Sequence, residues 1–445
     1  MEGIPTIDEF KRLKTYACRI RRIAYLPYAR HKDTRVPQDQ KALTALRARF
    51  NFYHKFLDQP LFPNLRQLEF VDARHAIHCL NTFQLTQTIS LSLFWDDSGS
   101  DVHFNPALRD LFLIIEQRAL NMEELDLGSS QSGVVVNTTH GSQVLSALVC
   151  KMSGLRGLAT GSQALNLDAL RHLASLPRLR KLQISNTSKD ILESIGTLHC
   201  AVFSELRQLT LHETDIPSCI RLIAHLKPLR LQALTLFVEP NPTPAEIHSI
   251  FSALEESTQH ANLHRVVLKL LRRPANASTV PFRRGVDASI LEPLLSFPNL
   301  TVVELNLPCL FDIEDEQVRA MAEAWPQLRR LQLGSLSGFW EASFVTCTGI
   351  LALVRNCPEL EYLALPFTCS GDPVPLRSSL TPADVNKRIT CLYAGLKGEM
   401  KYVYPKRVLQ FLRYIFPRLC GVDGPYIWDM DLVPVNASER MLSVA

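Results

Sequence analysis

Two groups of side chains in this sequence have the residue types that bind metal ions. Residues 75–79 contain the pattern His-x-x-His-Cys, and Cys347, Cys357 and Cys369 recur at short intervals. A structural zinc site needs four ligands with partners that orient them, and neither group supplies a complete set. We therefore predict exposed histidines on a helix for the first group and core thiols for the second. We expect no metal ion and no cofactor.

The sequence offers little support for catalysis. Gly128-Ser-Ser-Gln-Ser-Gly133 could bind phosphate, but no Lys-Ser/Thr pair follows it, as a Walker loop requires. A turn after a strand is predicted there instead. Neither a nucleophile elbow nor a kinase signature is present. Scattered Ser, His and Asp residues could still converge in space, but we expect a protein that is not an enzyme.

Charge and cysteine usage narrow the function classes further. The formal net charge is +4 over 445 residues, whereas nucleic-acid and membrane-surface proteins carry a basic stripe. Two arginine pairs, 272–273 and 283–284, could form a nuclear-targeting or acidic-partner patch, although a solvated loop is the preferred reading. The polar N-terminus has no apolar signal segment. With eleven cysteines and no Cys-x-x-Cys pair, we expect reduced thiols and a cytoplasmic or nuclear location.

The elements that must position any site follow from a recurring phrase. Trp325-Pro-Gln-Leu-Arg-Arg-Leu-Gln-Leu333 gives it in full. In the register Leu-x-x-Leu-x-Leu, a short strand points its leucines inward and the residues between them outward. Other copies begin at Phe62, Leu176, Phe297, Cys357 and Phe416. The predicted second leucine of each unit, here termed the anchor, is Leu68, Leu91, Leu125, Leu158, Leu182, Leu209, Leu234, Val266, Val303, Leu331 or Leu363, with weaker anchors at Leu392 and Val422.

Helical patterns fill the intervals between these strands. Segment 315–325 carries one apolar stripe at helical spacing, and segments 244–255 and 348–357 are similar. Parallel strands joined by right-handed helical crossovers build a curved parallel sheet with helices outside. The sequence therefore predicts an α/β leucine-rich-repeat solenoid, or horseshoe.

We predict one continuous solenoid in three parts. Residues 1–60 form a helical N-terminal cap, residues 61–395 the leucine-rich repeats, and residues 396–445 a C-terminal cap. Terminal repeats need such cover because a bare end exposes core. Ile23 and Tyr25 indicate a starting strand within the first cap.

The outward strand positions form the predicted binding surface, on the concave face. Acidic residues dominate early in the chain and basic residues later, as suits a protein partner with the opposite charge gradient. An equally open alternative is that exposed strand positions are simply polar. The residue types of Phe237, Arg330 and Tyr362 favour them as anchors of binding. The predicted partner-binding residues are Glu69, Glu124, Asp126, Lys181, Phe237, Arg265, Lys269, Arg330, Gln332 and Tyr362.

Two units carry a family resemblance. They contain Trp325-Pro-x-Leu-x-x-Leu-x-Leu333 and Cys357-Pro-x-Leu-x-x-Leu-x-Leu365. These units resemble the ribonuclease-inhibitor-like repeats of F-box/leucine-rich-repeat proteins, especially the fungal group. Segment 10–23 is similar to the part that follows the F-box in that group. The motifs are structural, so they specify a fold more than an activity.

The resemblance implies substrate recognition in a ubiquitin-ligase pathway. The F-box itself, a helical module usually beginning Leu-Pro-x-Glu, is not visible in this sequence. We therefore expect a ligase adaptor as partner only if an F-box lies upstream. The expected function is non-enzymatic protein binding, with no nucleic-acid or membrane partner. The alternative is an F-box-free scaffold or a small-GTPase regulator, although such regulators usually carry an acidic tail that segment 436–445 lacks.

Overall fold

The fold is described from a computed structural model, which divides the chain into two compact units, Met1–Leu206 (unit 1) and Arg207–Ala445 (unit 2). In the described part of the chain, no helix is both long and apolar enough to cross a bilayer. The structure describes residues 12, 15–25, 62–70, 90–93, 112–117, 122–128, 139–161, 163–185, 203–214, 216–225, 230–239, 241–270, 286–307, 309, 311–334, 344–367, 374–393, 406–419 and 421–422.

Unit 1 is a parallel sheet whose strands are neighbours in chain order. Helices α5 (Thr139–Lys151) and α6 (Leu167–Ser175) connect its later strands. The strands are β1 (Arg22–Tyr25), β2 (Gln67–Phe70), β3 (Ser90–Leu93), β4 (Glu124–Asp126), β5 (Gly157–Ala159) and β6 (Lys181–Ser185).

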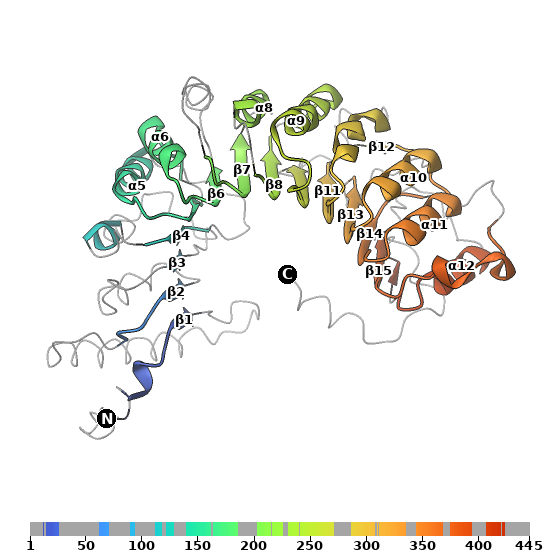
Figure 1. Ribbon diagram of the computed structural model, residues 1–445, viewed down its shortest axis with the longest axis horizontal. Coiled ribbons are helices and arrows are strands. Elements are labelled where there is room, and N and C mark those ends of the chain that lie inside the picture. Colours follow the sequence, from blue (N-terminus) through green and yellow to red (C-terminus); the bar gives the residue numbers. More distant parts are fainter. Residues whose placement is uncertain are drawn as a thin grey trace, which may run out of the picture. The chain divides into compact units, whose positions relative to one another are not determined.

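Unit 2 repeats the same plan, and its helices lie along one side of its strands (Figure 1). Its parallel strands are β7 (Gln208–Thr214), β8 (Ala233–Val238), β9 (Arg265–Leu270), β11 (Val302–Asn306), β13 (Arg330–Leu333), β14 (Tyr362–Ala364), β15 (Cys391–Tyr393) and β16 (Gly421–Val422). Its helices are α8 (Ile216–His225), α9 (Pro244–Ser257), η3 (Ala288–Ser296), α10 (Asp315–Ala324), α11 (Cys347–Asn356), η4 (Arg377–Ser379), η5 (Pro382–Asp384) and α12 (Lys406–Ile415). Strands β10 (Val286–Asp287) and β12 (Phe311–Asp312) pair separately.

The predicted anchors pair in register in both units. Leu68, Leu91, Leu125, Leu158 and Leu182 are successive Cα partners in unit 1. In unit 2 the series is Leu209, Leu234, Val266, Val303, Leu331, Leu363, Leu392 and Val422. Each anchor from Leu68 to Leu392 is at most 3% exposed, and burying one such side chain contributes about 1.5–3 kcal/mol. The predicted α/β leucine-rich-repeat solenoid fold is confirmed.

Eight strands of the large sheet start at the same kind of backbone contact. Two successive N–H groups donate to a single carbonyl of the preceding turn, here termed the start carbonyl. Arg329 N and Arg330 N, for example, donate to Thr301 O at 2.8 and 3.0 Å. The start carbonyls are Arg21, Glu123 and Arg156 in unit 1, and Arg207, Gln232, His264, Thr301 and Arg329 in unit 2.

The recurring phrase supplies core residues between helix and strand. Trp325 is fully buried, and its Nε1–H donates to Leu294 O at 3.0 Å. Cys357 occupies the same position one unit later, and its thiol donates toward Trp325 O at 3.4 Å. Burial raises the pKa of the Cys357 thiol to about 12. Cys347 is also buried, so both behave as the predicted core thiols, whereas Cys369 and residues 75–79 lie outside the described residues.

Helix starts follow local capping chemistry. At α9, the Thr243 hydroxyl accepts from Glu246 N at 3.2 Å, and Glu246 Oε2 accepts from Thr243 N at 2.8 Å. This reciprocal pair satisfies two backbone donors at the helix start. Proline at position 244 already has the backbone angle that the first helical residue needs. The helices predicted over 244–255, 315–325 and 348–357 agree with α9, α10 and α11 to within two residues.

The N-terminus of α11 is capped by a residue of α10. Asp315 Oδ1 accepts hydrogen bonds from Thr346 N at 2.7 Å and Gly349 N at 3.0 Å. Asp315 Oδ2 accepts from the Thr346 hydroxyl at 2.5 Å. A β-carbon on Gly349 would lie 2.5 Å from Asp315 Oδ1, so the cap requires glycine there.

The sheet reaches into both predicted caps. β1 pairs with β2 through Ile23 and Leu68, which places the expected starting strand within segment 1–60. β16 pairs with β15 within segment 396–445. The cap boundaries at residues 60 and 395 remain predictions.

Candidate partner-binding surface

The outward strand positions of unit 2 align in rows because the strands are in register. Arg265, Val302, Arg330 and Tyr362 are successive Cα partners in one row. Glu304 stands in the next row, paired with Val267 and Gln332. The third row contains His212, Phe237, Lys269 and Asn306. Predicted binding residues of unit 2 are thereby brought together on one face.

Glu304 organises the charges of this face. Its carboxylate is only 5% exposed, and each oxygen accepts one charged hydrogen bond. Oε1 accepts from Arg330 Nε at 3.0 Å, and Oε2 pairs with Lys269 Nζ at 2.7 Å. Burial tends to raise the pKa of Glu304, but the Lys269 hydrogen bond and the nearby cations outweigh it, so the pKa is lowered. Glu304 is therefore ionised at neutral pH and positions both cations.

We term four neighbouring residues the cation cluster: Arg265, Lys269, Glu304 and Arg330. Its three cations and one carboxylate give it two net positive charges. Among the described residues, the Arg265 side chain makes no hydrogen bond or ion pair, although its charge lowers the pKa of Glu304. Its exposed guanidinium can therefore bind an external anion. The cluster has the charge that an acidic partner requires.

Arg330 is also held by an aromatic side chain. Its guanidinium carbon lies 4.1 Å from the centroid of the Tyr362 ring, a cation–π geometry. The Tyr362 ring in turn lies 5.2 Å from the Tyr393 ring. Glu304 binds Arg330 through Nε alone, so its two terminal nitrogens have no hydrogen-bond acceptor among the described residues. A fixed guanidinium with unused donors can bind a carboxylate at a lower entropic cost.

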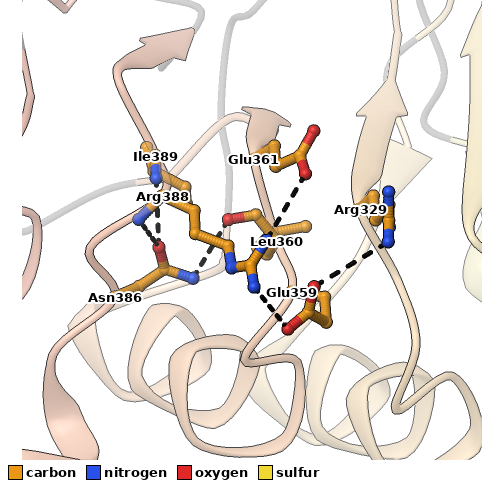
Figure 2. Close-up of polar contacts among 7 residues, drawn as sticks. All are labelled: Arg329, Glu359, Leu360, Glu361, Asn386, Arg388 and Ile389. Carbon is orange, nitrogen blue, oxygen red and sulfur yellow. Dashed lines mark hydrogen bonds and ion pairs between the residues drawn. The ribbon is translucent and has the colours of Figure 1, made fainter.

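Polar contacts, drawn in Figure 2, link the turns that precede β14 and β15, the strands that carry Tyr362 and Tyr393. Glu359 lies between Arg388, at 2.8 Å, and Arg329, at 3.9 Å. Asn386 Nδ2 donates to Leu360 O at 3.0 Å, while its Oδ1 accepts from Arg388 N and Ile389 N at 2.7 and 3.0 Å. These contacts fix the approach of both strands, and hence the places of Tyr362 and Tyr393.

A second aromatic pair lies on the other side of the cation cluster. The His212 and Phe237 rings stack with centroids 4.2 Å apart and planes inclined by 13°. Burial lowers the pKa of His212 to about 4, so the imidazole is neutral at pH 7. Phe237 is a Cα partner of Lys269. The pair therefore presents an uncharged aromatic surface beside a cation.

Unit 1 groups the acidic residues. Glu69 pairs with Arg22 at 2.9 Å, and Lys181 stands beyond Gly157 in the row of Glu124. Asp126 has a raised pKa, chiefly because of burial and then because of repulsion from Glu69 and Glu124, despite a hydrogen bond from the Gly128 backbone. Acidic residues thus gather in unit 1 and cations in unit 2.

The structure differs from the sequence-based prediction at three residues of this surface. Gln332 is 4% exposed, and its side-chain nitrogen donates to Gly334 O at 3.3 Å, so it supports the surface from within. His212 and Tyr393 were not among the predicted binding residues. Strand alternation from Leu211 and Leu392 was the signal that could have identified them.

We expect Glu304→Gln to lower the free energy of unfolding by about 1–2 kcal/mol at pH 7, because it leaves two partly exposed cations without their counter-ion. Because the native pKa lies below the ordinary value of 4.5, this stabilisation is complete above pH 4.5 and disappears as pH falls through the native pKa. Urea denaturation of both proteins at pH 7 and near the acid limit of stability measures the difference. The control is Glu316→Gln, on the exposed face of α10. A difference independent of pH would contradict the assigned role of Glu304.

Comparisons with known proteins add little to this geometry. No model of a known protein family matches the sequence, and no curated protein matches it. Among solved structures, the chain is similar to one described as the crystal structure of the Rad7 and Elc1 complex in yeast. The two chains are 14% identical, with 98% of this chain and 97% of that chain covered and a TM-score of 0.36.

Proposed function

We propose that this protein is a non-enzymatic binding protein whose cation cluster contacts an acidic surface of a protein partner. The observation that carries the proposal is the arrangement around Glu304, where a buried carboxylate fixes the partly exposed side chains of Lys269 and Arg330. Arginine and tyrosine are the residue types that contribute most to protein interfaces. Cations that are already positioned lose little conformational freedom when they bind.

We propose further, from the repeat phrases alone, that the partner is a substrate of a ubiquitin-ligase pathway. Repeats like those at 325–333 and 357–365 recur in proteins that select such substrates. Affinity purification of the full native gene product, with quantification of cullin-type ligase subunits, tests this assignment. If no ligase subunit co-purifies, the scaffold function remains and the ligase assignment falls.

The cation cluster can be tested with a matched pair of double variants. We expect Arg265→Ala/Arg330→Ala to weaken partner binding about 30- to 1,000-fold, since each truncated interface arginine costs about 1–2 kcal/mol and the two together about 2–4 kcal/mol. The control, Arg319→Ala/Arg407→Ala, removes the same charge from the helices α10 and α12 of the same unit. Partners retained by the wild type and by the control are quantified by mass spectrometry after affinity purification from native cells. Equal retention of these partners by both double variants would contradict the proposal.

A further inference from the structure

We infer that the bound segment of the partner is an extended peptide with the order apolar–acidic–apolar, in which the three side chains contact successive parts of the unit 2 face. This inference rests on the proposed function and specifies the chemistry of the partner at the same surface. It follows from the order in which the strands present their outward residues.

The order across the strands is aromatic, cationic, aromatic. The His212–Phe237 pair comes from β7 and β8, and the Tyr362–Tyr393 pair from β14 and β15. The cation cluster comes from β9, β11 and β13, which are consecutive neighbours between the two pairs. A segment that crosses these strands therefore meets an aromatic surface, then positive charge, then a second aromatic surface.

The strand spacing sets the spacing in the partner. Neighbouring strands lie about 4.8 Å apart, and an extended chain rises about 3.3 Å per residue. Phe237 on β8 is two strands from Glu304 on β11, and Glu304 is two strands from Tyr362 on β14. Each step therefore spans about 10 Å across the strands and, because it also moves two residues along them, about 12 Å in all, or three to four residues of an extended peptide. The acidic side chain should stand about three to four residues from each apolar one.

The middle position calls for a carboxylate. Both oxygens of Glu304 are already occupied, while the guanidinium of Arg265 and the terminal nitrogens of Arg330 have no acceptor among the described residues. An arginine fork matches a carboxylate with two parallel hydrogen bonds. A partner carboxylate would thus meet unused donors and leave the internal pairs intact.

The outer positions call for apolar side chains. The neutral imidazole of His212 and the ring of Phe237 stack nearly parallel, so the pair offers flat ring surface without charge. The tyrosines offer a second ring surface beside Arg330. An apolar side chain that packs against either ring pair removes apolar surface of both the peptide and the rings from water, which favours binding. A nucleic-acid strand suits the face less well, because its affinity comes from many phosphate contacts and the cluster has three cations.

A displayed library of random 12-residue peptides tests the inference on the full chain. Selection on the wild type should enrich an acidic residue flanked on both sides, about three to four positions away, by apolar residues. Arg265→Ala/Arg330→Ala should remove the acidic preference, and Phe237→Ala should remove one apolar preference. The control Arg319→Ala/Arg407→Ala should enrich the same pattern as the wild type.

The peptide side gives a readout that does not depend on the folding of variants. In an enriched peptide, replacing the acidic residue by its amide, or moving it by two positions, should weaken binding to the wild type at least tenfold. Enrichment of acidic peptides without flanking apolar residues, or tolerance of the shifted position, would overturn the inference and leave the proposed function standing. If Arg265→Ala/Arg330→Ala affects neither peptides nor partners, both fall. Tighter binding of a single-stranded oligonucleotide than of any selected peptide would also overturn the inference.

Discussion

Replacement of Trp325 by alanine is expected to lower the free energy of unfolding by about 3–5 kcal/mol, among the larger costs of a single core substitution. The indole is fully buried between helix α10 and strand β13. Alanine would leave a cavity, and Leu294 O would lose the N–H that it accepts at 3.0 Å. The cost combines lost burial, lost contacts and the loss of one of the two hydrogen bonds to Leu294 O, which keeps the bond from Phe297 N.

Trp325→Phe separates these contributions. Phenylalanine stands at the corresponding position 297 and is also fully buried, so the site accepts an aromatic ring. We expect Trp325→Phe to cost about 1–2 kcal/mol, mainly from the lost hydrogen bond and a smaller ring. Urea denaturation followed by far-ultraviolet circular dichroism gives both values. If the alanine and phenylalanine variants had equal stability, packing of the indole could not be the main contribution.

The second large effect is that of Gly349→Ala on the free energy of unfolding, which we expect to depend on whether the Asp315 carboxylate is present. In the wild type, Gly349→Ala should destabilise the protein by about 2 kcal/mol, because the new methyl group displaces the carboxylate that caps α11. The clash distance of 2.5 Å to Asp315 Oδ1 leaves no room for both groups. In an Asp315→Ala background the carboxylate is absent, and alanine is a better helix former than glycine by about 1 kcal/mol. There the new carbon still meets Val345 Cγ1 at 3.0 Å, a contact that a shift of a few tenths of an ångström relieves, so the same substitution should be neutral or slightly stabilising.

A double-mutant cycle measures this coupling directly. Wild type, Asp315→Ala, Gly349→Ala and the double variant are compared by urea denaturation, and the coupling energy should exceed about 2 kcal/mol. The control is Gly154→Ala, at a position outside helix α11. A β-carbon there would meet its nearest atom, Met122 O, at 3.8 Å, so the substitution causes no clash. Additive effects of the two substitutions would show that the cap and the glycine are independent.

The strand register could be predicted from sequence because one rule governs every unit. An anchor such as Leu331 must point inward, so alternation places Arg330 and Gln332 outward without knowledge of any partner strand. The same rule places Leu363 opposite Leu331, and the two are Cα partners in the sheet. Helix ends followed from local signals such as Thr243 and Pro244. Each of these features depends on residues close together in the chain.

The site was less predictable because its contacts join different units. Alternation placed Glu304 outward, but its burial depends on Lys269 and Arg330, which come from two other strands. Tyr393 was missed because the anchor at Leu392 has no complete phrase around it. The Asp315 cap on α11 joins residues 31 and 34 positions apart, and no local pattern indicates such a contact.

The start carbonyls bear on how such a protein can change through evolution. Each uses only backbone atoms, as where Glu361 N and Tyr362 N donate to Arg329 O, so almost any sequence can form it. The interval from one anchor to the next can then vary, here from 24 residues for Leu158 to Leu182 up to 37 residues for Val266 to Val303. When a whole strand–helix segment is duplicated or lost, the next strand still finds a start carbonyl in the turn before its new neighbour. When only part of a segment is lost, that carbonyl can be lost with it. New combinations of outward residues can therefore arise by genetic recombination, with the sheet unchanged.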